Sequence, residues 1–474
     1  MFRLVVEKEL REIIGTTKFA VTFGVCSVLL LLAFYVGARN YQVSRAEYDA
    51  AQTENLRQME GLTDWNQVTH RVFLPPQPLA TLVSGISNDI GRTTEMRGRG
   101  ELRAENSRFN EDPIYAVFRF LDLEFIFGIV LSLFAILFAY DAINGEKERG
   151  TLRLSFANAV PRDKYILGKL VGSFLALAVP LLVPILIGCL MLPMMNIPMT
   201  GSEWMRLGMV VLAGYLYLGV FLTLSVFISA LTHKSSTSFL MLLVVWIFAV
   251  LIIPRAAVLV AGRAVEVPSI DKINYDKSRY MTQLWEEDRE KMNAWMQENS
   301  MPRDGDREEW MKNFRSYMSE LSDVRDEKSR EFGGRLNEER RNREGVQQGV
   351  ALGIARLSPT SVFSLASTDL AGTSLELKQR YTESAAAYQQ TYAQFMREKT
   401  GEARGGIAII IRGRGEEEEE PDPIDPYELP AFEYQPPSTS ETINEALFDI
   451  GVLLMFNIVF FVGAFAAFLR YDVR

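Results

Sequence analysis

Four ionisable side chains stand at the ends of long apolar runs, and they are the first candidates for chemistry in this sequence. They are Asp122, Glu124, Arg255 and Asp449. A charge inside an apolar segment is costly, so such residues tend to pair with one another or to line a water-filled path. We expect Arg255 to pair with Asp449 or Glu124 at the outer mouth of a conduit through a membrane. The alternative is that each side chain reaches the membrane surface separately.

The chain has no residue spacing that is typical of a covalent catalyst. Gly168-Lys169 resembles the end of a nucleotide-binding loop, but Asp163 stands where the first glycine is required and Leu170 follows the lysine. The histidines and cysteines lack the spacing of a zinc or haem site, and they form no disulfide framework. We therefore expect no catalytic residue, no metal site and no cofactor bound by this chain.

A short charged connector carries the clearest sign of a binding function. Within Asp141–Lys169, the stretch Gly145–Thr151 reads GEKERGT and places both charge signs in consecutive positions. Apolar helices are expected on both sides of the connector, so a push on it would move both helices. It therefore suits a lever for a motor protein, although a solvated turn is the alternative. The candidate residues are Asp141, Glu146, Lys147, Glu148, Arg149, Gly150 and Thr151.

Six apolar runs position these residues. A run of about 20 apolar residues is long enough to cross a bilayer as a helix. The expected spans are residues 19–36, 120–140, 170–192, 207–231, 238–260 and 446–469. Cleavage of the first span as a signal peptide is an alternative, but the polar lead of residues 1–18 is long for a signal.

Basic residues predict the orientation of the spans. With six spans, the lead at 1–18, the connector at 141–169, the loop after the fourth span and the tail at 470–474 fall on one side, and each carries lysine or arginine. The positive-inside rule makes that side the cytoplasm. Residues 1–18 also have the pattern of an amphipathic helix on the membrane surface. We expect a protein integral to the bacterial inner membrane, with both termini cytoplasmic.

Two large polar regions, residues 37–119 and 261–445, are then expected outside. Tyr41–Leu56 is expected to continue the first helix. In the second region, apolar residues recur at helical spacing around 311–324 and 381–395, which predicts two amphipathic helices packed as a hairpin. Residues 401–437 read as an acidic, proline-rich linker, whose Glu416–Glu420 run needs no ligand. The expected fold is an α-helical polytopic membrane protein with six transmembrane helices and two mainly helical extracytoplasmic domains.

The connector resembles that of permease subunits of ABC-2 type transporters. The resemblance rests on the GEKERGT core, on Val160-Pro161-Arg162 and on Leu167-Gly168-Lys169. Further motifs are similar to a subgroup with large extracytoplasmic insertions after spans one and five. These motifs are Leu121-Asp122-Leu123, Leu357-Ser358-Pro359 with Leu370-Ala371-Gly372-Thr373, and Lys8-Glu9-Leu10-Arg11-Glu12, which is similar to the family's interfacial elbow helix.

The resemblance implies a transport subunit and not an enzyme. Two permease subunits, either identical copies or paralogues, form the pathway, and separate cytoplasmic ABC ATPases bind ATP and magnesium. The loop at 141–153 acts as a coupling helix, with Glu146, Glu148 and Arg149 in contact with the ATPase. Closure of the ATPase pair then drives substrate outward across the lipid bilayer.

Three functions remain open at this point. The first is a permease subunit of an ATP-driven exporter. The second is a force-transmitting ABC membrane subunit that works an extracytoplasmic or cell-envelope protein without moving cargo, because the polar region after the fifth span is larger than in compact members of the family. The third is an ATPase-independent membrane scaffold or sensor. The net charge of -9 argues against a nucleic-acid partner.

Overall fold

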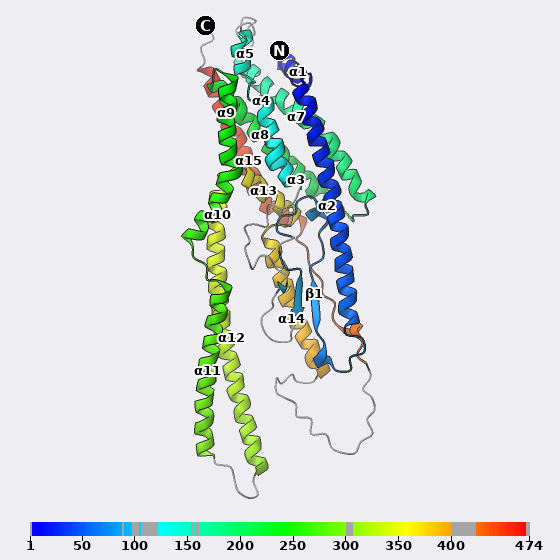
Figure 1. The fold of residues 1–474 in the computed structure, drawn as a ribbon, viewed down its shortest axis with the longest axis vertical. Helices are drawn as coiled ribbons and strands as arrows, with labels where there is room; N and C mark the ends of the chain where they lie inside the picture. The colour runs from blue at the N-terminus through cyan, green and yellow to red at the C-terminus, as the bar shows by residue number, and fades with distance from the viewer. Residues whose placement is uncertain are drawn as a thin grey trace. The chain divides into compact units, whose positions relative to one another are not determined.

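The computed structural model describes residues 2–87, 90–96, 104–105, 122–152, 156, 161–299, 307–400 and 423–470. Among these residues, six helices are long and apolar enough to cross a membrane, and the protein is mainly helical (Figure 1). This confirms the predicted α-helical polytopic fold. The chain divides into two compact units, of which the second is Arg255–Ala355 and the first is the remainder.

The six candidate spans have clear bounds, and two of them contain a single π-helical turn. The helix α2 includes Tyr41–Leu56, which confirms the predicted continuation of the first apolar helix. The spans are α2 (Thr17–Arg57), α3-η5-α4 (Leu123–Phe125, Ile126–Leu131, Ser132–Ala139), α7 (Arg162–Met194), α8 (Gly201–Leu231), α9-η6-α10 (Ser235–Trp246, Ile247–Ile252, Ile253–Ala264) and α15 (Thr439–Leu469).

Polar caps determine where several of these helices begin. The Thr16 side chain accepts a hydrogen bond from the backbone N–H of Phe19 at the start of α2. Thr200 with Glu203 forms a capping box at α8, and Ser438 with Glu441 forms one at α15. These side chains satisfy N–H groups that have no partner within the first helical turn. Each cap therefore fixes the point at which a polar connector becomes an apolar helix.

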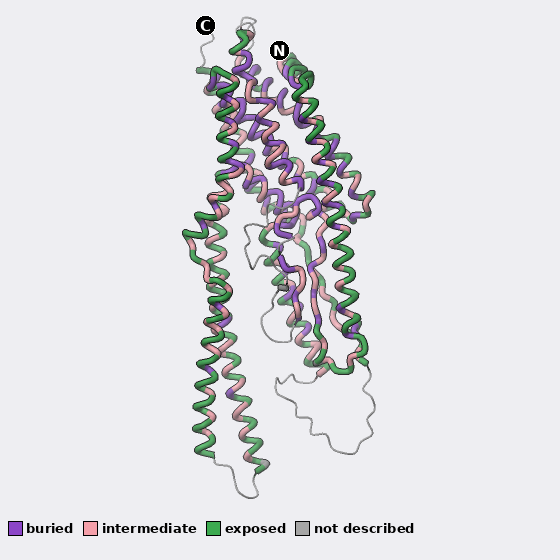
Figure 2. Tube along the Cα trace, viewed as in Figure 1, coloured by how far each residue is buried: buried purple, intermediate pink, exposed green. Residues whose placement is uncertain are grey.

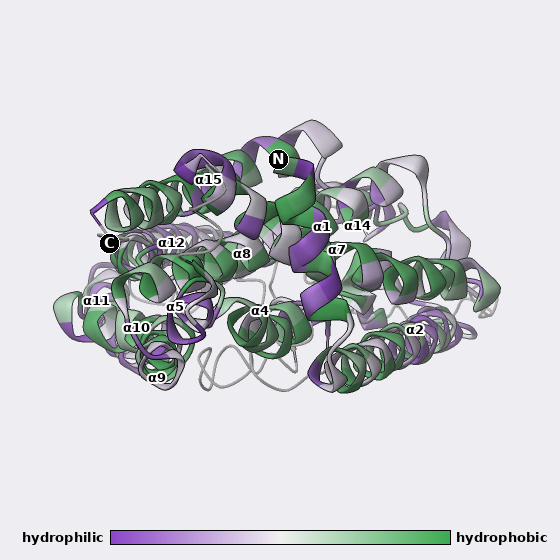
Figure 3. Ribbon diagram, turned by 90° about the horizontal axis from the view of Figure 1, so that it is seen from above, coloured by the Kyte–Doolittle hydropathy of each residue, from purple (hydrophilic) through white to green (hydrophobic). Residues whose placement is uncertain are grey.

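The helix α8 forms the centre of the first unit. The helices α15, α7, α4 and α13 (Pro359–Ala371) pack against it. Buried residues concentrate among these helices (Figure 2), and Tyr217 and Phe221 of α8 are fully buried. The helices α2 and α9 instead expose apolar side chains such as Val28 and Leu240. Hydrophobic residues predominate along α2 and α4 in Figure 3. Continuous exposed apolar surface of this kind is expected where helices face lipid.

A small antiparallel sheet, which the sequence pattern did not predict, follows α2. Its strand order is β1 (His70–Phe73), β2 (Thr93–Met96) and β3 (Ala104–Glu105), with His70 opposite Met96. Short 3-10 turns at η1 (Trp65–Gln67) and η2 (Pro78–Thr81) flank β1, and η7 (Pro426–Glu428) precedes α15.

The helix α14 (Glu376–Thr400) packs against this sheet and not as the predicted hairpin partner of the region around 311–324. Tyr388 and Tyr392 of α14 join Val72 and Met96 in one buried cluster. The range 261–445 includes residues of both compact units. The tyrosine stripe of α14 covers strands from the first polar region. An amphipathic stripe predicts a buried face but does not specify its partner.

The second unit contains a hairpin of α11 (Ile270–Glu298) and α12 (Arg307–Ala355). The two helices run antiparallel, since Lys277 Nζ donates to Asn337 Oδ1 while Asp288 accepts from Arg325. Near the turn, the Trp295 ring lies 5.5 Å from that of Tyr317 and 5.7 Å from that of Trp310. The helix expected around 311–324 is thus present, and α11 is its partner.

Candidate functional site

The loop after the second span forms a short helix, α5 (Asn144–Glu148). Gly150 lies just beyond it with φ of 71°, a left-handed conformation that favours glycine. The backbone N–H groups of Ile143 and Asn144 donate to Ser229 Oγ at 3.0 and 3.1 Å. The buried Asn144 side chain donates from Nδ2 to Thr232 Oγ1 at 2.9 Å. The end of α8 therefore holds the start of α5.

Lys147 adds a further bond to α8, and Glu148 extends the attachment to α9. Lys147 Nζ donates to the carbonyl of Ala230 at 2.7 Å. The Glu148 carboxylate accepts from the backbone N–H of Ser235 at 3.0 Å and from Ser235 Oγ at 2.8 Å. Ser235 is the first residue of α9, so the carboxylate lies at a helix N-terminus, where the dipole favours an anion.

A buried cluster of charges fixes the other side of α5. We define the charge cluster as Lys8 and Glu9 of α1 (Phe2–Ile14), Glu146 of α5, and Tyr165 and Lys169 of α7. Lys169 Nζ lies 2.5 Å from Glu9 Oε2 and 2.9 Å from Glu146 Oε1. Glu146 also accepts from Lys8 Nζ at 2.8 Å and from Tyr165 OH at 2.7 Å. Three helices that are distant in sequence thus meet at one set of ion pairs.

The charge cluster is neutral as a whole, and all of its charges except that of Lys8 are buried. Glu9, Glu146 and Lys169 are 4%, 1% and 2% exposed. Burying two carboxylates and an ammonium group is favourable only when each charge has close partners of the opposite sign. The loss of one partner leaves an uncompensated buried charge, which costs about 3–5 kcal/mol. The cluster therefore makes the arrangement of α1, α5 and α7 strongly interdependent.

Two glycines of α7 allow α1 to approach closely enough to form this cluster. A Cβ atom added at Gly168 would lie 2.7 Å from Val5 Cγ1, and one at Gly172 would lie 2.7 Å from Glu9 Cβ. Small residues four positions apart let two helices pack at short distance within a membrane protein. The spacing of Gly168 and Gly172 is thus the sequence signal that indicates the α1 contact.

The exposed part of the loop is smaller than the sequence predicted. Glu148, Arg149 and Gly150 are exposed, whereas Glu146 is buried in the charge cluster. Its carboxylate contacts Lys8, Tyr165 and Lys169 within this chain, and a direct contact of Glu146 with a partner stays a prediction. Asp141 and Thr151 are half-buried. A partner contact by Glu148 and Arg149 stays a prediction.

The four residues expected at the outer mouth lie in different surroundings. Asp449 is 1% exposed, and its two oxygens accept from Arg356 Nε at 2.7 Å and from Arg356 Nη2 at 3.0 Å. Glu124 accepts a hydrogen bond from Ser364 Oγ of α13. Arg255 is the first residue of the second unit, and its pairing stays a prediction. The sequence prediction missed Arg356, although it immediately precedes the Leu357-Ser358-Pro359 motif.

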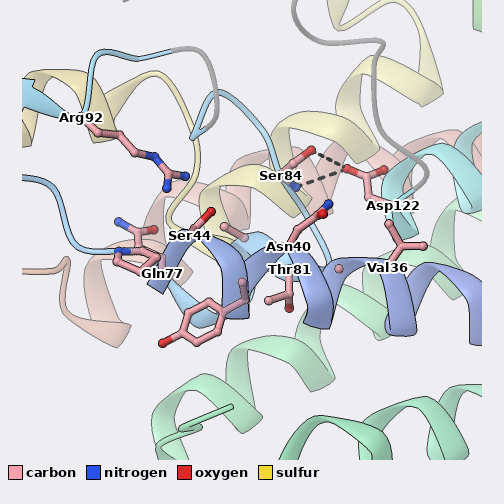
Figure 4. Close-up of a pocket in the computed structure, with 12 residues that line it drawn as sticks. Val36, Asn40, Ser44, Gln77, Thr81, Ser84, Arg92 and Asp122 are labelled. Carbon is pink, nitrogen blue, oxygen red and sulfur yellow. Dashed lines mark hydrogen bonds between the residues drawn. The ribbon is translucent and has the colours of Figure 1, made fainter. Parts of the chain in front are cut away.

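Asp122 instead caps α3 and borders a small cavity. It accepts from the backbone N–H of Phe125 at 2.9 Å and from Ser84 Oγ at 2.8 Å. Burial raises the pKa of this carboxyl group. Figure 4 shows Asp122 and Ser84 at one end of the cavity, with Asn40 of α2 between them and Arg92. The cavity volume is about 40 Å³, which accommodates a few water molecules and no cargo.

No potential metal centre is evident in the part of the chain that the structure describes, since no group of three or more His, Cys, Asp or Glu side chains converges there. The features of the site are thus ion pairs and hydrogen bonds between helices, together with a small exposed charged turn. Such an arrangement positions helices and offers a docking surface.

Six apolar helices joined by such a loop define an integral membrane protein. A sequence-family model described as "ABC-2 family transporter protein" matches residues 3–473, which is nearly the whole chain. The chain therefore belongs to the ABC-2 transporter family and is a non-catalytic membrane subunit of an ABC transporter. Subunits of this family bind no cofactor themselves and work with ATPase subunits. A search of curated proteins found no similar sequence.

Proposed function

We propose that this chain is the permease subunit of an ATP-driven exporter and that α5 with its exposed turn docks a separate ATPase. The observation that carries this proposal is the attachment of α5 on both sides. The charge cluster ties α5 to α1 and α7, and Glu148 and Asn144 tie it to the connector between α8 and α9. A displacement of α5 by a partner therefore reaches four helices without passing through a flexible loop.

In this proposal each residue of the loop has a distinct role. Glu148 and Arg149, with Gly150, form the surface that the ATPase contacts. Glu146 is a positioning residue that transmits the displacement to α1 and α7 through the charge cluster. Two such permease subunits, identical or paralogous, form the pathway, and ATP with magnesium binds on the partner ATPases.

We also propose an orientation for the chain. The N-terminal helix α1 and the end of α15 lie at the same end of the first unit as α5 (Figure 1). The basic residues of that end support a cytoplasmic location under the positive-inside rule. The sheet, α14 and the α11–α12 hairpin are then extracytoplasmic insertions, and the membrane is the bacterial inner membrane.

The test is purification of the full-length chain from its native membrane in mild detergent. We expect a nucleotide-binding protein to co-purify with the natural chain and to be lost on Arg149→Glu. Ser235→Ala is the first control, because it removes a partner of Glu148 without changing the surface charge. The second control exchanges the charges of Arg45 and Asp49, an exposed ion pair of α2. Equal co-purification from all four proteins would contradict the proposal.

A second candidate function is force transmission to an extracytoplasmic or cell-envelope protein without movement of cargo. The α11–α12 hairpin favours it, because α12 has 49 residues and the hairpin forms a compact unit of its own. Reconstitution of the complex in vesicles separates the two functions. Outward movement of candidate cargo during ATP hydrolysis supports the exporter, whereas hydrolysis without any cargo movement supports force transmission. An ATPase-independent scaffold or sensor would hydrolyse no ATP in complex with any partner.

A further inference from the structure

Two spans of this chain contain a π-helical turn. The second span contains η5 (Ile126–Leu131), and the fifth contains η6 (Ile247–Ile252). A π turn holds one residue more than an α turn, is rare, and occurs frequently at functional sites. In both turns, a backbone carbonyl accepts hydrogen bonds from side-chain hydroxyl groups. The two π turns are thus specifically stabilised by residues around them.

The carbonyl of Gly128 in η5 accepts two hydroxyl groups. Ser132 Oγ donates to it at 2.7 Å, and Tyr217 OH of α8 donates to it at 2.7 Å. Because the Tyr217 proton is used in this way, its oxygen accepts from Thr360 Oγ1 of α13, at 2.9 Å. The Tyr217 ring also stacks on Phe363 of α13, with centroids 4.9 Å apart. The η5 turn is therefore connected through α8 to α13.

The η6 turn is connected to α13 and, through Trp246, to Ser132 at the start of α4. Ser358, the N-cap of α13, donates from Oγ to the carbonyl of Ala249 in η6 at 2.5 Å. Trp246, immediately before η6, donates from Nε1 to Ser132 Oγ at 2.9 Å. The bonds close into a circuit from η5 through α8, α13, η6 and back to η5. We define the hydroxyl ring as Ser132, Tyr217, Trp246, Ser358 and Thr360.

Four members of the hydroxyl ring are buried, and the fifth, Thr360, is half-buried. Ser132, Tyr217 and Ser358 are 0% exposed and Trp246 is 8% exposed. A buried polar group that loses its partner keeps the full cost of leaving water, so the members of the ring depend on one another. Opening the ring at one place therefore weakens the support of both π turns.

We propose that the hydroxyl ring is a register lock that holds the π turns of spans two and five and releases them together. Migration of a π turn by one helical turn rotates the residues it passes by about 100° and moves them by about 1.5 Å along the axis. Ser132 of the ring lies 12 residues before the start of α5, which is roughly 18 Å at 1.5 Å per residue. The trigger for its opening rests on the proposed ATP-driven cycle, whereas the lock itself is a property of this chain.

The first test measures hydrogen–deuterium exchange of the full-length chain in lipid nanodiscs. Thr360→Val removes one hydroxyl group with little change in side-chain shape. We expect the rate of amide exchange at residues 126–131 and 247–252 to rise about fivefold, the factor that corresponds to the loss of one hydrogen bond. Thr360→Ser keeps the hydroxyl and should exchange like the natural protein. Trp246→Phe breaks the ring on its other side and should raise exchange in the same two segments. A rise in only one segment, or an equal rise for Thr360→Ser and Thr360→Val, would overturn the lock.

The second test removes the extra residue of η5. Deletion of Val130 should convert the π turn into an α turn. The residues on either side should keep their orientation around the helix axis, so the chain should fold and still bind its ATPase. Deletion of Ala135, in regular α4, rotates the rest of that span by about 100° and should prevent folding. In the natural complex, ATP with magnesium should raise exchange in both segments, and the Val130 deletion should abolish this response at 247–252 as well.

The outcomes separate the two proposals. If no ATPase co-purifies, the proposed function fails, and the exchange of Thr360→Val still decides the lock. If the ATPase binds and ATP raises exchange at 247–252 equally with and without the Val130 deletion, the lock is wrong while the proposed function stands.

Discussion

Replacement of Lys169 by methionine should destabilise the protein strongly. The substitution keeps the length and packing of the buried side chain but removes the ammonium group that lies 2.5 Å from Glu9 and 2.9 Å from Glu146. The Glu9 carboxylate, which is 4% exposed, then loses its ion pair, whereas Glu146, which is 1% exposed, keeps its pair with Lys8. Breaking a buried ion pair in this way costs about 3–5 kcal/mol of unfolding free energy.

A second substitution shows whether this cost comes from charge. In the double variant Lys169→Met with Glu9→Gln, the remaining charges are Lys8 and Glu146, which still form a pair at 2.8 Å. We therefore expect the double variant to be more stable than Lys169→Met alone, with a coupling energy of about 1–3 kcal/mol. Lys8→Met is the matched control, because the Lys8 side chain is 46% exposed and its loss should cost less than about 1 kcal/mol.

The assay is reversible unfolding of the full-length chain in mixed micelles, with increasing SDS and intrinsic fluorescence as the signal. If the unfolding free energy of Lys169→Met lies within about 0.5 kcal/mol of that of the natural protein, the range of an ordinary surface substitution, the reasoning is refuted. Additive effects of Lys169→Met and Glu9→Gln would also refute it, since independent sites do not share a charge cluster.

Three further predictions concern other parts of the chain. Burial lowers the pKa of His70 to about 4. The contribution of neutral His70 to the stability of the sheet should therefore be complete above pH about 6.5 and should fall by about 3 kcal/mol as the pH drops toward 4. Thermal unfolding at different pH values should show this loss for the natural protein but not for His70→Gln. Gly172→Leu should displace α1 and expose it to protease, whereas Gly24→Leu should not, since nothing lies within 4 Å of a Cβ at Gly24. Arg356→Met should leave the carboxylate of Asp449 unpaired and cost about 3–5 kcal/mol in the SDS assay, with partial recovery in Arg356→Met with Asp449→Asn.

The spans could be predicted from the sequence because their signal is local. About 20 apolar residues in succession are sufficient evidence for a membrane helix, whatever the helix packs against. The continuation of α2 through Tyr41–Leu56 was likewise predictable from adjacent residues. The three strands were not, because each has only two to four residues, and β1 and β2 depend on the tyrosines of α14 for their apolar cover.

The contacts between helices that are distant in sequence could not be predicted from the sequence pattern. Glu146 has the appearance of an exposed charge within GEKERGT, and only the approach of Lys8 and Lys169 shows that it is buried. In the same way, the amphipathic stripe of α12 predicted a partner helix but did not distinguish α11 from α14. The π turns have no distinct pattern of apolar residues, since spans two and five are apolar on all sides there.

The most direct test of the central claim is photo-crosslinking from the exposed turn in native membranes. With p-benzoylphenylalanine in place of Arg149, we expect an adduct to a nucleotide-binding protein. The same group in place of Arg45, an exposed residue of α2, should give no such adduct. A nucleotide-binding protein crosslinked equally from both positions, or from neither, would contradict the account in which α5 docks the ATPase.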